Sequence, residues 1–365
     1  MKAAAIKSHC FDLAEKLEKT GNLSDGEFTE ILLCQEPGFD AYLAARAREV
    51  RERYYGKEVY LRGLIEFTNY CRNNCNYCGI RRDNRNAQRY RLNEEEIISC
   101  ADMGYELGFR TFVLQGGEDP YFTDERIVSI VRSMKDRHPD CAITLSIGEK
   151  EISSYKKFFE AGADRYLLRH ETADQEHYEL LHPAEMSYEH RMECLWSLKK
   201  IGYQVGCGMM VGSPGQTAGH LIEDLRFLQK YRPEMVGIGP FIPHHDTEYA
   251  KEKPGTVEMT LRLLSVIRLI LPEVLLPATT ALGTIDPLGR EKGLAAGANV
   301  VMPNLSPTGV RGKYLLYDNK ICTGDEAAEC IRCMSLRVKR TGYHVVESRG
   351  DHINHRKSSY MQDGK

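Results

Sequence analysis

The sequence predicts an α/β fold of the (βα)8 barrel type, preceded by a helical extension. From Val59 onward, short apolar runs alternate with amphipathic stretches at intervals of about 30 residues, the length of one strand and helix unit. Four of these stretches end in a glycine shortly before the next apolar run, at Gly108, Gly162, Gly202 and Gly297. Glycine tolerates the left-handed conformation that closes a helix, so its repeated use marks a repeated turn. Eight such units close naturally into a barrel, and an open doubly wound sheet is the alternative.

The N-terminal segment, residues 1–58, predicts two or three helices that cover the bottom of the barrel. Ser24 and Glu27 form a capping box before one of them. We expect the barrel to occupy residues 59–343. Residues 344–365 are polar and weakly periodic, and they predict a tail whose histidines are solvated.

Eight segments of the barrel region are predicted to be strands. Several are continuous apolar runs such as TFVLQ and YLLR, as expected for strands buried on both faces of a parallel sheet. Between them lie helical patterns, one of which begins with a capping box formed by Asn93 and Glu96. The predicted strands are residues 60–67, 110–115, 142–147, 165–168, 204–210, 235–238, 275–278 and 299–302.

Composition favours a globular enzyme. The 365 residues are 42% hydrophobic and 28% charged, which excludes a disordered or collagen-like chain. The net charge of −3, without a run of five basic residues, argues against nucleic acid or a membrane as a partner. The first residues lack the apolar stretch of a signal peptide, so a cytoplasmic protein is predicted. In a reducing compartment, clustered thiols among the 12 cysteines are expected to hold metal or do chemistry.

The strongest local signal is Cys71, Cys75 and Cys78, which follow the first predicted strand in the pattern CxxxCxxC. Active sites of barrels form at the carboxyl ends of their strands. Three thiolates within one loop can hold a polynuclear iron–sulfur centre and leave one iron open for a small molecule. The alternative is a set of buried or zinc-bound cysteines, although a structural zinc site prefers four protein ligands.

This loop resembles that of the radical S-adenosylmethionine (SAM) superfamily. The resemblance implies a TIM-type radical SAM barrel, a [4Fe-4S] cluster on the three cysteines, and SAM as the ligand of the open iron. Tyr77 stands where the superfamily places an aromatic ring against adenine. The segment Gln115, Gly116, Gly117 and Glu118 resembles the superfamily's GGE motif, which approaches the SAM ammonium.

Other polar residues near predicted strand ends are expected to complete the SAM site. Arg191 is a planar donor for the SAM carboxylate, and Glu171 is an acceptor for the ribose hydroxyls. Ordinary salt bridges are the alternative for each of them. The full set of these expected contacts is Thr144, Arg169, Glu171, Arg191 and Met210.

The chain also resembles the HydE family of maturases, which help to assemble the active-site H-cluster of [FeFe]-hydrogenase. Matching segments such as VLQGGEDPYF, AGADRYLLRHETA, MVGIGPFIPHHDT and LLPATTALGTIDPLGRE lie between about Leu61 and Cys333. The resemblance implies reductive cleavage of SAM to a 5′-deoxyadenosyl radical that acts on a cysteine-bound iron carbonyl cyanide complex made by HydG. It further implies a HydF-type scaffold and a low-potential flavodoxin or ferredoxin as partners. Gly116 departs from the serine common in that family and removes one hydroxyl.

Three alternatives to this function stay open. A 3-methylornithine synthase or a biotin-synthase-like enzyme would share the barrel and the cysteine loop. The third is a zinc or iron–sulfur scaffold that delivers metal without radical chemistry.

Further polar residues near strand ends predict the substrate site. Arg165, Thr279, Thr280 and Asn304 are expected to cradle an anionic end of the substrate. A phenol of Tyr314 or Tyr317 could contact substrate or relay a proton, and lid packing is the alternative.

A second cysteine group, Cys322, Cys330 and Cys333, matches the accessory site of some HydE proteins. It predicts a second [4Fe-4S] or [2Fe-2S] cluster, against the alternative of three free thiols. His244 and His245 are adjacent, but no third metal ligand is evident in the sequence, so loop packing is the expected role of both.

Overall fold

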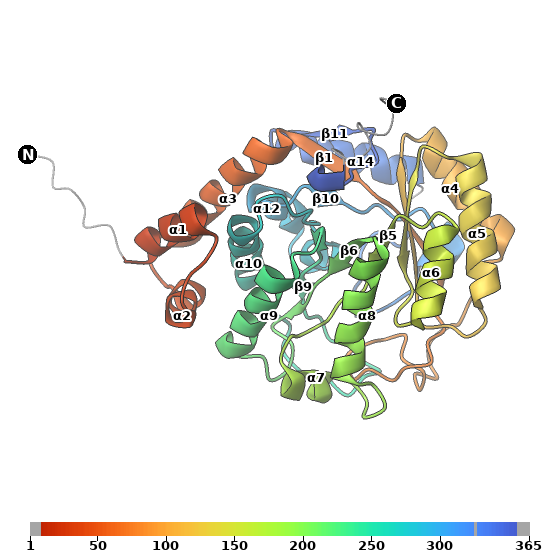
Figure 1. The fold of residues 1–365 in the computed structure, drawn as a ribbon, viewed down its shortest axis with the longest axis horizontal. Coiled ribbons are helices and arrows are strands. Elements are labelled where there is room, and N and C mark those ends of the chain that lie inside the picture. Colours follow the sequence, from red (N-terminus) through yellow and green to blue (C-terminus); the bar gives the residue numbers. More distant parts are fainter. Residues whose placement is uncertain (1–8, 325–326, 356–365) are drawn as a thin grey trace, which may run out of the picture.

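The computed structural model describes residues 9–324 and 327–355, and in the second range it describes the side chains from residue 331 onward. Six parallel strands form the main sheet in the order β2-β3-β4-β5-β6-β8. Helices surround this sheet on its outer side (Figure 1). The six strands are Gly63–Thr68, Thr111–Gly116, Ala142–Ser146, Arg165–Leu167, Gln204–Cys207 and Met235–Val236.

Two short strand segments close the sheet into a barrel. Met235 of β8 is bridged in parallel to Leu275, and Pro277 is bridged in parallel to Val300 of β10 (Val300–Val301). The segment that follows β10 returns to the first strand, because Asn304 is bridged in parallel to Leu64 of β2. The eight predicted strand regions thus form a closed ring, and the predicted (βα)8 barrel is confirmed over the open sheet.

The local sequence signals that predicted the strand and helix units are present in the structure. The four turn glycines, Gly108, Gly162, Gly202 and Gly297, have φ values of +87°, +111°, +112° and +102°. Capping boxes begin both α2 and α4, as their sequences predicted. The helices are α1 His9–Thr20, α2 Asp25–Leu33, α3 Phe39–Tyr55, α4 Glu94–Glu106, α5 Asp124–Arg137, α6 Ile152–Glu160, α7 Gln175–Leu181, α8 Tyr188–Ile201, α9 Ala218–Tyr231, α10 Val257–Ile270, α11 Thr280–Ile285, α12 Gly289–Ala295, α13 Thr308–Arg311 and α14 Ala327–Arg340.

The N-terminal helices lie against the side of the barrel, so the prediction that they cover its bottom was wrong. Helix α3 packs along α10, and α2 packs against α9 (Figure 1). Arg226 of α9 reaches the start of α2, where its Nη2 lies 2.6 Å from Oδ1 of Asp25. The extension therefore continues the outer helical layer.

The C-terminal segment occupies the amino ends of the strands instead. Strand β11 (His344–Val346) pairs in parallel with β1 (Glu58–Leu61), which in turn pairs with β10. The segment then runs beneath β5 and β6, where His352 is buried. Residues 345–355 are therefore held against the amino ends of the strands, unlike the solvated tail that the sequence predicted, because several of their polar side chains find partners there. His344 is exposed as predicted, and residues 356–365 of the predicted tail lie outside the described residues.

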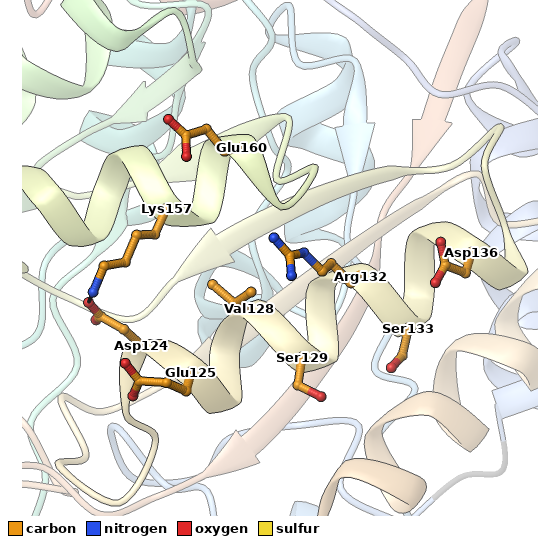
Figure 2. A pocket seen from close by; sticks show the side chains of 9 residues that line it. All are labelled: Asp124, Glu125, Val128, Ser129, Arg132, Ser133, Asp136, Lys157 and Glu160. Carbon is orange, nitrogen blue, oxygen red and sulfur yellow. Dashed lines mark hydrogen bonds and ion pairs between the residues drawn. The ribbon is translucent and has the colours of Figure 1, made fainter.

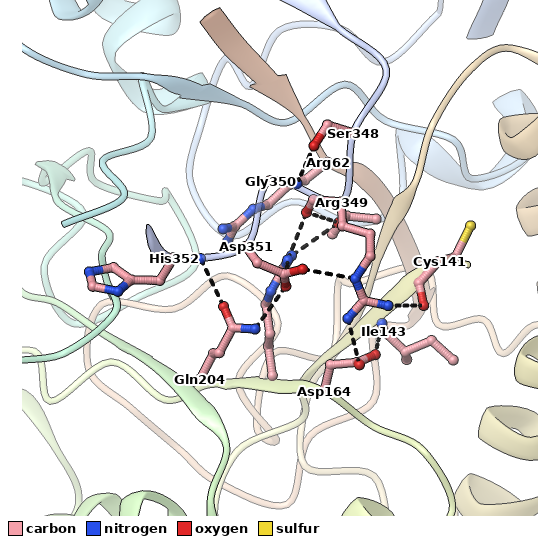
Figure 3. A network of polar contacts seen from close by, with 12 residues as sticks. Arg62, Cys141, Ile143, Asp164, Gln204, Ser348, Arg349, Gly350, Asp351 and His352 are labelled. Carbon is pink, nitrogen blue, oxygen red and sulfur yellow. Dashed lines mark hydrogen bonds and ion pairs between the residues drawn. The ribbon is translucent and has the colours of Figure 1, made fainter. Parts of the chain in front are cut away.

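A network of charges fixes this segment (Figure 3). Arg165 at the start of β5 donates to Oδ1 of Asp351 at 2.6 Å and to the carbonyl of Arg349 at 2.7 Å. Arg349 in turn donates to Asp351 at 2.8 Å and to Asp164 at 2.8 Å. Buried carboxylates and guanidiniums are stable when paired in this way.

The opposite end of the barrel, where the strands have their carboxyl ends, carries the loops with the predicted site. There β7 (Met210–Val211) and β9 (Gly239–Pro240) form a second, two-stranded parallel sheet. Within the ranges that the structure describes, no helix combines the length and the apolarity needed to cross a membrane.

Candidate active site

The loop with the three cysteines joins β2 to α4 and is held from within by one arginine. Nη1 of Arg89 donates to the carbonyl of Ile80 at 2.9 Å, and its Nη2 donates to the carbonyls of Arg81 at 2.6 Å and Asn84 at 3.1 Å. A planar guanidinium with five donors suits this gathering of carbonyls. Asn69 anchors the start of the loop by donating to the carbonyl of Lys313 at 2.7 Å. Arg89 therefore fixes the shape of the loop, a role that its place in the sequence did not reveal.

The glycine-rich segment after β3 lies directly against this loop. A Cβ atom at Gly117 would lie 2.2 Å from the carbonyl oxygen of Tyr70 and 2.7 Å from Cβ of Cys71. The side chain of Glu118 pairs with Nε of Arg72 at 2.9 Å and accepts the backbone N–H of Glu149 at 2.9 Å. The Glu118 carboxylate thus has one partner in the cysteine loop and one in the loop after β4. The glycine-rich segment therefore fixes the distance between these two loops.

The three cysteine thiols are partly buried together at the carboxyl end of β2. Burial, and then the neighbouring Cys71 sulfur, raises the pKa of Cys78 to about 12. Burial also raises the pKa of Cys75 well above its usual value, with Cys78 and Cys71 as further causes. Without a metal the thiols are therefore protonated, and cluster binding would displace these protons.

The number of thiols in the loop distinguishes a cluster from a closed zinc site. A structural zinc ion takes four protein ligands, whereas three thiolates leave one iron of a four-iron cluster open. Among the described side chains, the only three potential ligands within 4.8 Å of one another are His244, His245 and Asp246. The described side chains therefore form no closed zinc site at Cys71, Cys75 and Cys78, and three thiolates on one loop suit an iron–sulfur cluster with an open iron.

A charged turn after β5 faces the same end of the barrel. Nη2 of Arg169 lies 3.0 Å from Oε2 of Glu171. Nη2 of Arg169 and Oε2 of Glu171 have no hydrogen bond in the described structure beyond this ion pair, and the buried Nε of Arg169 has no hydrogen-bond partner there. Glu171 also has a φ of +66°, a conformation that residues other than glycine rarely adopt. Unsatisfied polar atoms and a strained backbone together fit a site that is completed by a polar ligand.

Arg191 of α8 lies beside this turn. Its Nη1 donates to the carbonyl of Arg169 at 2.6 Å, and its Nε pairs with Oε1 of Glu149. Arg191 is buried, so Glu149 compensates its charge and fixes its orientation. The sequence analysis did not identify Glu149, because the two residues are distant along the chain.

Tyr77 extends from the cysteine loop toward α7 and β7. Its hydroxyl lies 3.3 Å from Nε2 of His182, whose Nδ1 lies 2.9 Å from the carbonyl of Tyr178. Burial, and then Arg191, lowers the pKa of His182 to about 3, so this imidazole is neutral. The ring of Tyr77 packs with an apolar group that includes Met210. The structure thus brings two predicted SAM contacts together.

Other predicted residues line the mouth of the barrel. Gln115 donates to the hydroxyl of Tyr314 at 3.4 Å. Asn304 donates to Oε2 of the buried Glu66 at 2.8 Å, and Nζ of Lys320 pairs with Oε1 of Glu66 at 2.6 Å. Lys320 also donates to the carbonyl of Tyr314 at 2.8 Å. Glu66 and Lys320 were missed by the sequence analysis, although Glu66 lies on the strand that precedes the cysteines.

The remaining mouth residues lie on the segments after Pro277 and after β10. Oγ1 of Thr279 is buried without a hydrogen-bond partner in the described structure. Thr280 accepts from Nη2 of Arg290 at 3.3 Å. Burial raises the pKa of Tyr317 to about 12, so its phenol keeps its proton.

Two predicted site residues lie away from the mouth. Thr144 stands in the middle of β4, which ends at Ser146, so the prediction that it lies near the end of a strand was wrong. Arg165 begins β5 at the opposite end of the barrel, where Asp351 already neutralises its charge. Both line a small internal space together with Arg62.

The accessory cysteines lie near α14. The thiol of Cys322 lies 3.6 Å from both Nη1 and Nη2 of Arg290, and Cys333 is exposed. The side chain of Cys330, the third predicted ligand, lies outside the described residues. The second cluster therefore stays a prediction.

His244 and His245 lie beside the cysteine loop. Nδ1 of His245 is 2.7 Å from Oδ1 of Asp318, and the two imidazole rings stack at 4.4 Å. These contacts join two loops. The structure also brings a ligand atom of Asp246 within 4.8 Å of both imidazoles, a third potential ligand that the sequence did not reveal, so the packing role stays a prediction. The shallow groove shown in Figure 2 lies between α5 and α6, on the outer helical layer, and none of its lining residues belongs to the predicted site.

Comparisons with known proteins agree with this site. Residues 65–228 match the model of the radical SAM superfamily. The [FeFe] hydrogenase maturase subunit HydE of Thermotoga maritima is 47% identical over 91% of this chain and 94% of its own. The 3-methylornithine synthase of Methanosarcina acetivorans is 33% identical over 79% of this chain and 81% of its own. The crystal structure of the methylornithine synthase PylB superposes with a TM-score of 0.79 at 28% identity, and covers 92% of this chain and 97% of that one.

The closed barrel and the three-cysteine loop at the end of its first strand, together with these matches, define a radical SAM enzyme. Enzymes of this superfamily carry a [4Fe-4S] cluster and bind SAM, and three partly buried thiols on one loop suit such a cluster. Within the superfamily, this chain belongs to the HydE family.

Proposed function

We propose that this protein is a maturase that takes part in assembling the di-iron subcluster of the [FeFe]-hydrogenase H-cluster. The observation that carries the proposal is the 47% identity to a HydE maturase along 91% of the chain. When bound, a [4Fe-4S] cluster supplies the electron that cleaves SAM and yields a 5′-deoxyadenosyl radical.

The residues of this chain would bind and orient SAM. Cys71, Cys75 and Cys78 would hold three irons and leave the fourth for the amino and carboxylate groups of SAM. Arg191, fixed by Glu149, would bind the SAM carboxylate, since a guanidinium matches a carboxylate in geometry.

The adenosine part of SAM requires different partners. The carboxylate of Glu171, whose Oε2 is paired with Arg169 and makes no further hydrogen bond in the described structure, would accept the ribose hydroxyls. The ring of Tyr77 offers a face for adenine beside Met210. Gln115, Gly116, Gly117, Glu118 and Arg169 remain predicted contacts of the same ligand, whereas Thr144 lies in the middle of β4, away from the mouth.

The substrate would occupy the barrel mouth next to this site. It would be the cysteine-bound iron carbonyl cyanide complex that HydG supplies. Asn304 and Thr279 offer a polar lining, and the protonated phenols of Tyr314 and Tyr317 can donate hydrogen bonds to an anionic ligand. Lys320 adds a cation that Glu66 holds in place.

The other partners are inferred from the family. Cys322, Cys330 and Cys333 would hold a second cluster near the surface, as exposure of Cys333 permits. A HydF-type scaffold would receive the product, and a flavodoxin or ferredoxin would reduce the cluster, in the cytoplasm. The near-neutral net charge of −3 agrees with protein partners rather than nucleic acid.

Anaerobic reconstitution tests the proposal. The protein is loaded with iron and sulfide, reduced with dithionite and given SAM. We expect 5′-deoxyadenosine, and we expect that a hydrogenase maturation mixture with the other maturases produces active enzyme only when this protein is present. If the protein carries its full cluster content but forms no 5′-deoxyadenosine, the proposed enzyme activity is excluded.

A second candidate function rests on the 33% identity to a 3-methylornithine synthase. That enzyme shares the barrel and so the SAM site, and the two functions differ in substrate. Incubation of the reduced protein with SAM and lysine distinguishes them. Accumulation of 3-methylornithine, together with inactivity in the maturation mixture, would reverse the choice.

A further inference from the structure

His170 stands between Arg169 and Glu171 in the charged turn, but its side chain points into the protein. Both His170 and Asp224 of α9 are fully buried. Nε2 of His170 lies 3.2 Å from Oδ1 of Asp224, and Nδ1 of His170 accepts the backbone N–H of Gly208 at 3.3 Å. Because Nδ1 accepts a hydrogen bond, Nε2 carries the proton of the neutral imidazole and donates it to Asp224.

Gly208 connects this pair to Glu171. The backbone N–H of Glu171 donates to the carbonyl of Gly208 at 3.0 Å, and the carbonyl of Glu171 accepts from the N–H of Met210 at 3.3 Å. The segment that binds His170 is therefore the same segment that holds both backbone groups of Glu171.

Asp224 also holds the other side of the turn. Its Oδ1 accepts the backbone N–H of Ala173 at 2.6 Å. One carboxylate oxygen thus fixes the turn at His170, before Glu171, and at Ala173, after it. The ring of Phe227, one turn further along α9, packs against His170 with its centroid 4.7 Å away.

The backbone of Glu171 requires such support. A non-glycine residue at a φ of +66° is strained, and it persists only where surrounding contacts determine it. Removal of the contacts on both sides would let the turn relax, and the Glu171 carboxylate would then leave its position beside Arg169.

We propose that Asp224 is a positioning residue of the SAM site, which acts through His170 and Ala173 to hold Glu171 in the conformation that binds the ribose hydroxyls. Asp224 itself touches no ligand. The proposal rests on the proposed function, since it assumes that Glu171 binds the ribose of SAM.

A ribose-dependent binding measurement tests this role. Reconstituted, cluster-containing protein is titrated anaerobically with SAM and with a SAM analogue that lacks both ribose hydroxyls. The ratio of the two affinities reports the Glu171 contact, and a general loss of stability does not change it. The variants are Glu171→Ala, Asp224→Ala, the double variant, and Asp224→Asn, whose side-chain carbonyl can still accept both hydrogen bonds.

We expect wild type to prefer SAM by about tenfold or more, the size of one hydrogen bond to a charged group. Glu171→Ala and Asp224→Ala should each lose most of this preference, the double variant should lose no more than either alone, and Asp224→Asn should keep it. If Asp224→Ala does not retain its cluster, His170→Phe is measured instead. This variant keeps the packing against Phe227 but makes neither hydrogen bond, and it should also lose the preference.

Two results would overturn the inference. One is an unchanged preference in Asp224→Ala or in His170→Phe, and the other is a wild type that binds SAM without any preference. Neither affects SAM cleavage, so the proposed function would remain. Absence of SAM binding by the wild type would instead refute the proposed function.

Discussion

Replacement of Gly117 by alanine tests the close approach of two loops at the cluster site. The new Cβ would lie 2.2 Å from the carbonyl oxygen of Tyr70 and 2.7 Å from Cβ of Cys71, both of which are fixed groups. Because backbone must move to remove this overlap, we expect a cost at the upper end of the range for overpacking, about 3 kcal/mol. The cysteine loop would move with Tyr70, so cluster occupancy should fall as well.

Gly26 in α2 offers a matched control, since a Cβ there would have no neighbour within 4 Å. Gly26→Ala, in the first turn of α2, should change the free energy of unfolding by less than about 1 kcal/mol, the value for a helix interior. Urea unfolding of both variants gives the free energies, and iron analysis after anaerobic reconstitution gives the occupancy. The reasoning is refuted if Gly117→Ala unfolds within 0.5 kcal/mol of wild type, on the order of the scatter of surface substitutions, and keeps its full iron content.

The remaining predictions concern the cysteines, the barrel bottom and a buried histidine. Cys75→Ala should abolish formation of 5′-deoxyadenosine, whereas Cys330→Ala should leave it largely intact, and the opposite pattern would mean that the two centres are assigned wrongly. Asp351→Asn should destabilise the protein by about 3 kcal/mol or more in urea, because it leaves the charge of the buried Arg165 without its counter-charge. Asp25→Asn is the control, because the Asp25 side chain is 71% exposed. We expect it to change the free energy of unfolding by less than about 1 kcal/mol. Equal losses of stability in the two variants would contradict the burial of the Arg165 ion pair. The pKa of His182 is about 3 in the folded protein, against an ordinary value of 6.5. As the pH falls below 6.5, this imidazole therefore takes up a proton in the unfolded state but stays neutral in the folded state. Below pH 6.5 this group should therefore lower the free energy of unfolding by about 1.4 kcal/mol per pH unit. In urea unfolding of the cluster-free protein, His182→Gln should remove this contribution to the pH dependence of stability. An equal pH dependence in wild type and variant would exclude the low pKa assigned to His182.

Local sequence signals predicted much of the fold and the centre of the site. Apolar periodicity located the strand regions, and the turn glycines have the positive φ values that their positions implied. The cysteine loop was identified because Cys71, Cys75 and Cys78 are close along the chain. The strand lengths were less accurate: the predicted strand 204–210 is divided into β6 and β7, because hydrogen bonding ends where the barrel opens.

Contacts between distant residues were not predictable in the same way. Arg165 was assigned to the substrate from its strand, but Asp351, its partner, is 186 residues further along the chain. The C-terminal segment was taken for a solvated tail because its polar composition gives no sign of the partners that bury it. Glu149, His182 and Asp224 likewise act on the site from other elements, and only the folded chain brings them to it.

The sequence by itself determined the repeated strand and helix unit, the cysteine loop and the family, since each depends on residues that are near one another or on identity along the chain. Only the tertiary structure decided which segment closes the barrel, which loops lie against the three cysteines, and which buried groups hold the turn at Glu171. The reason is physical: periodicity and turn chemistry are local properties, whereas ring closure, burial and charge pairing depend on distances that exist only after folding.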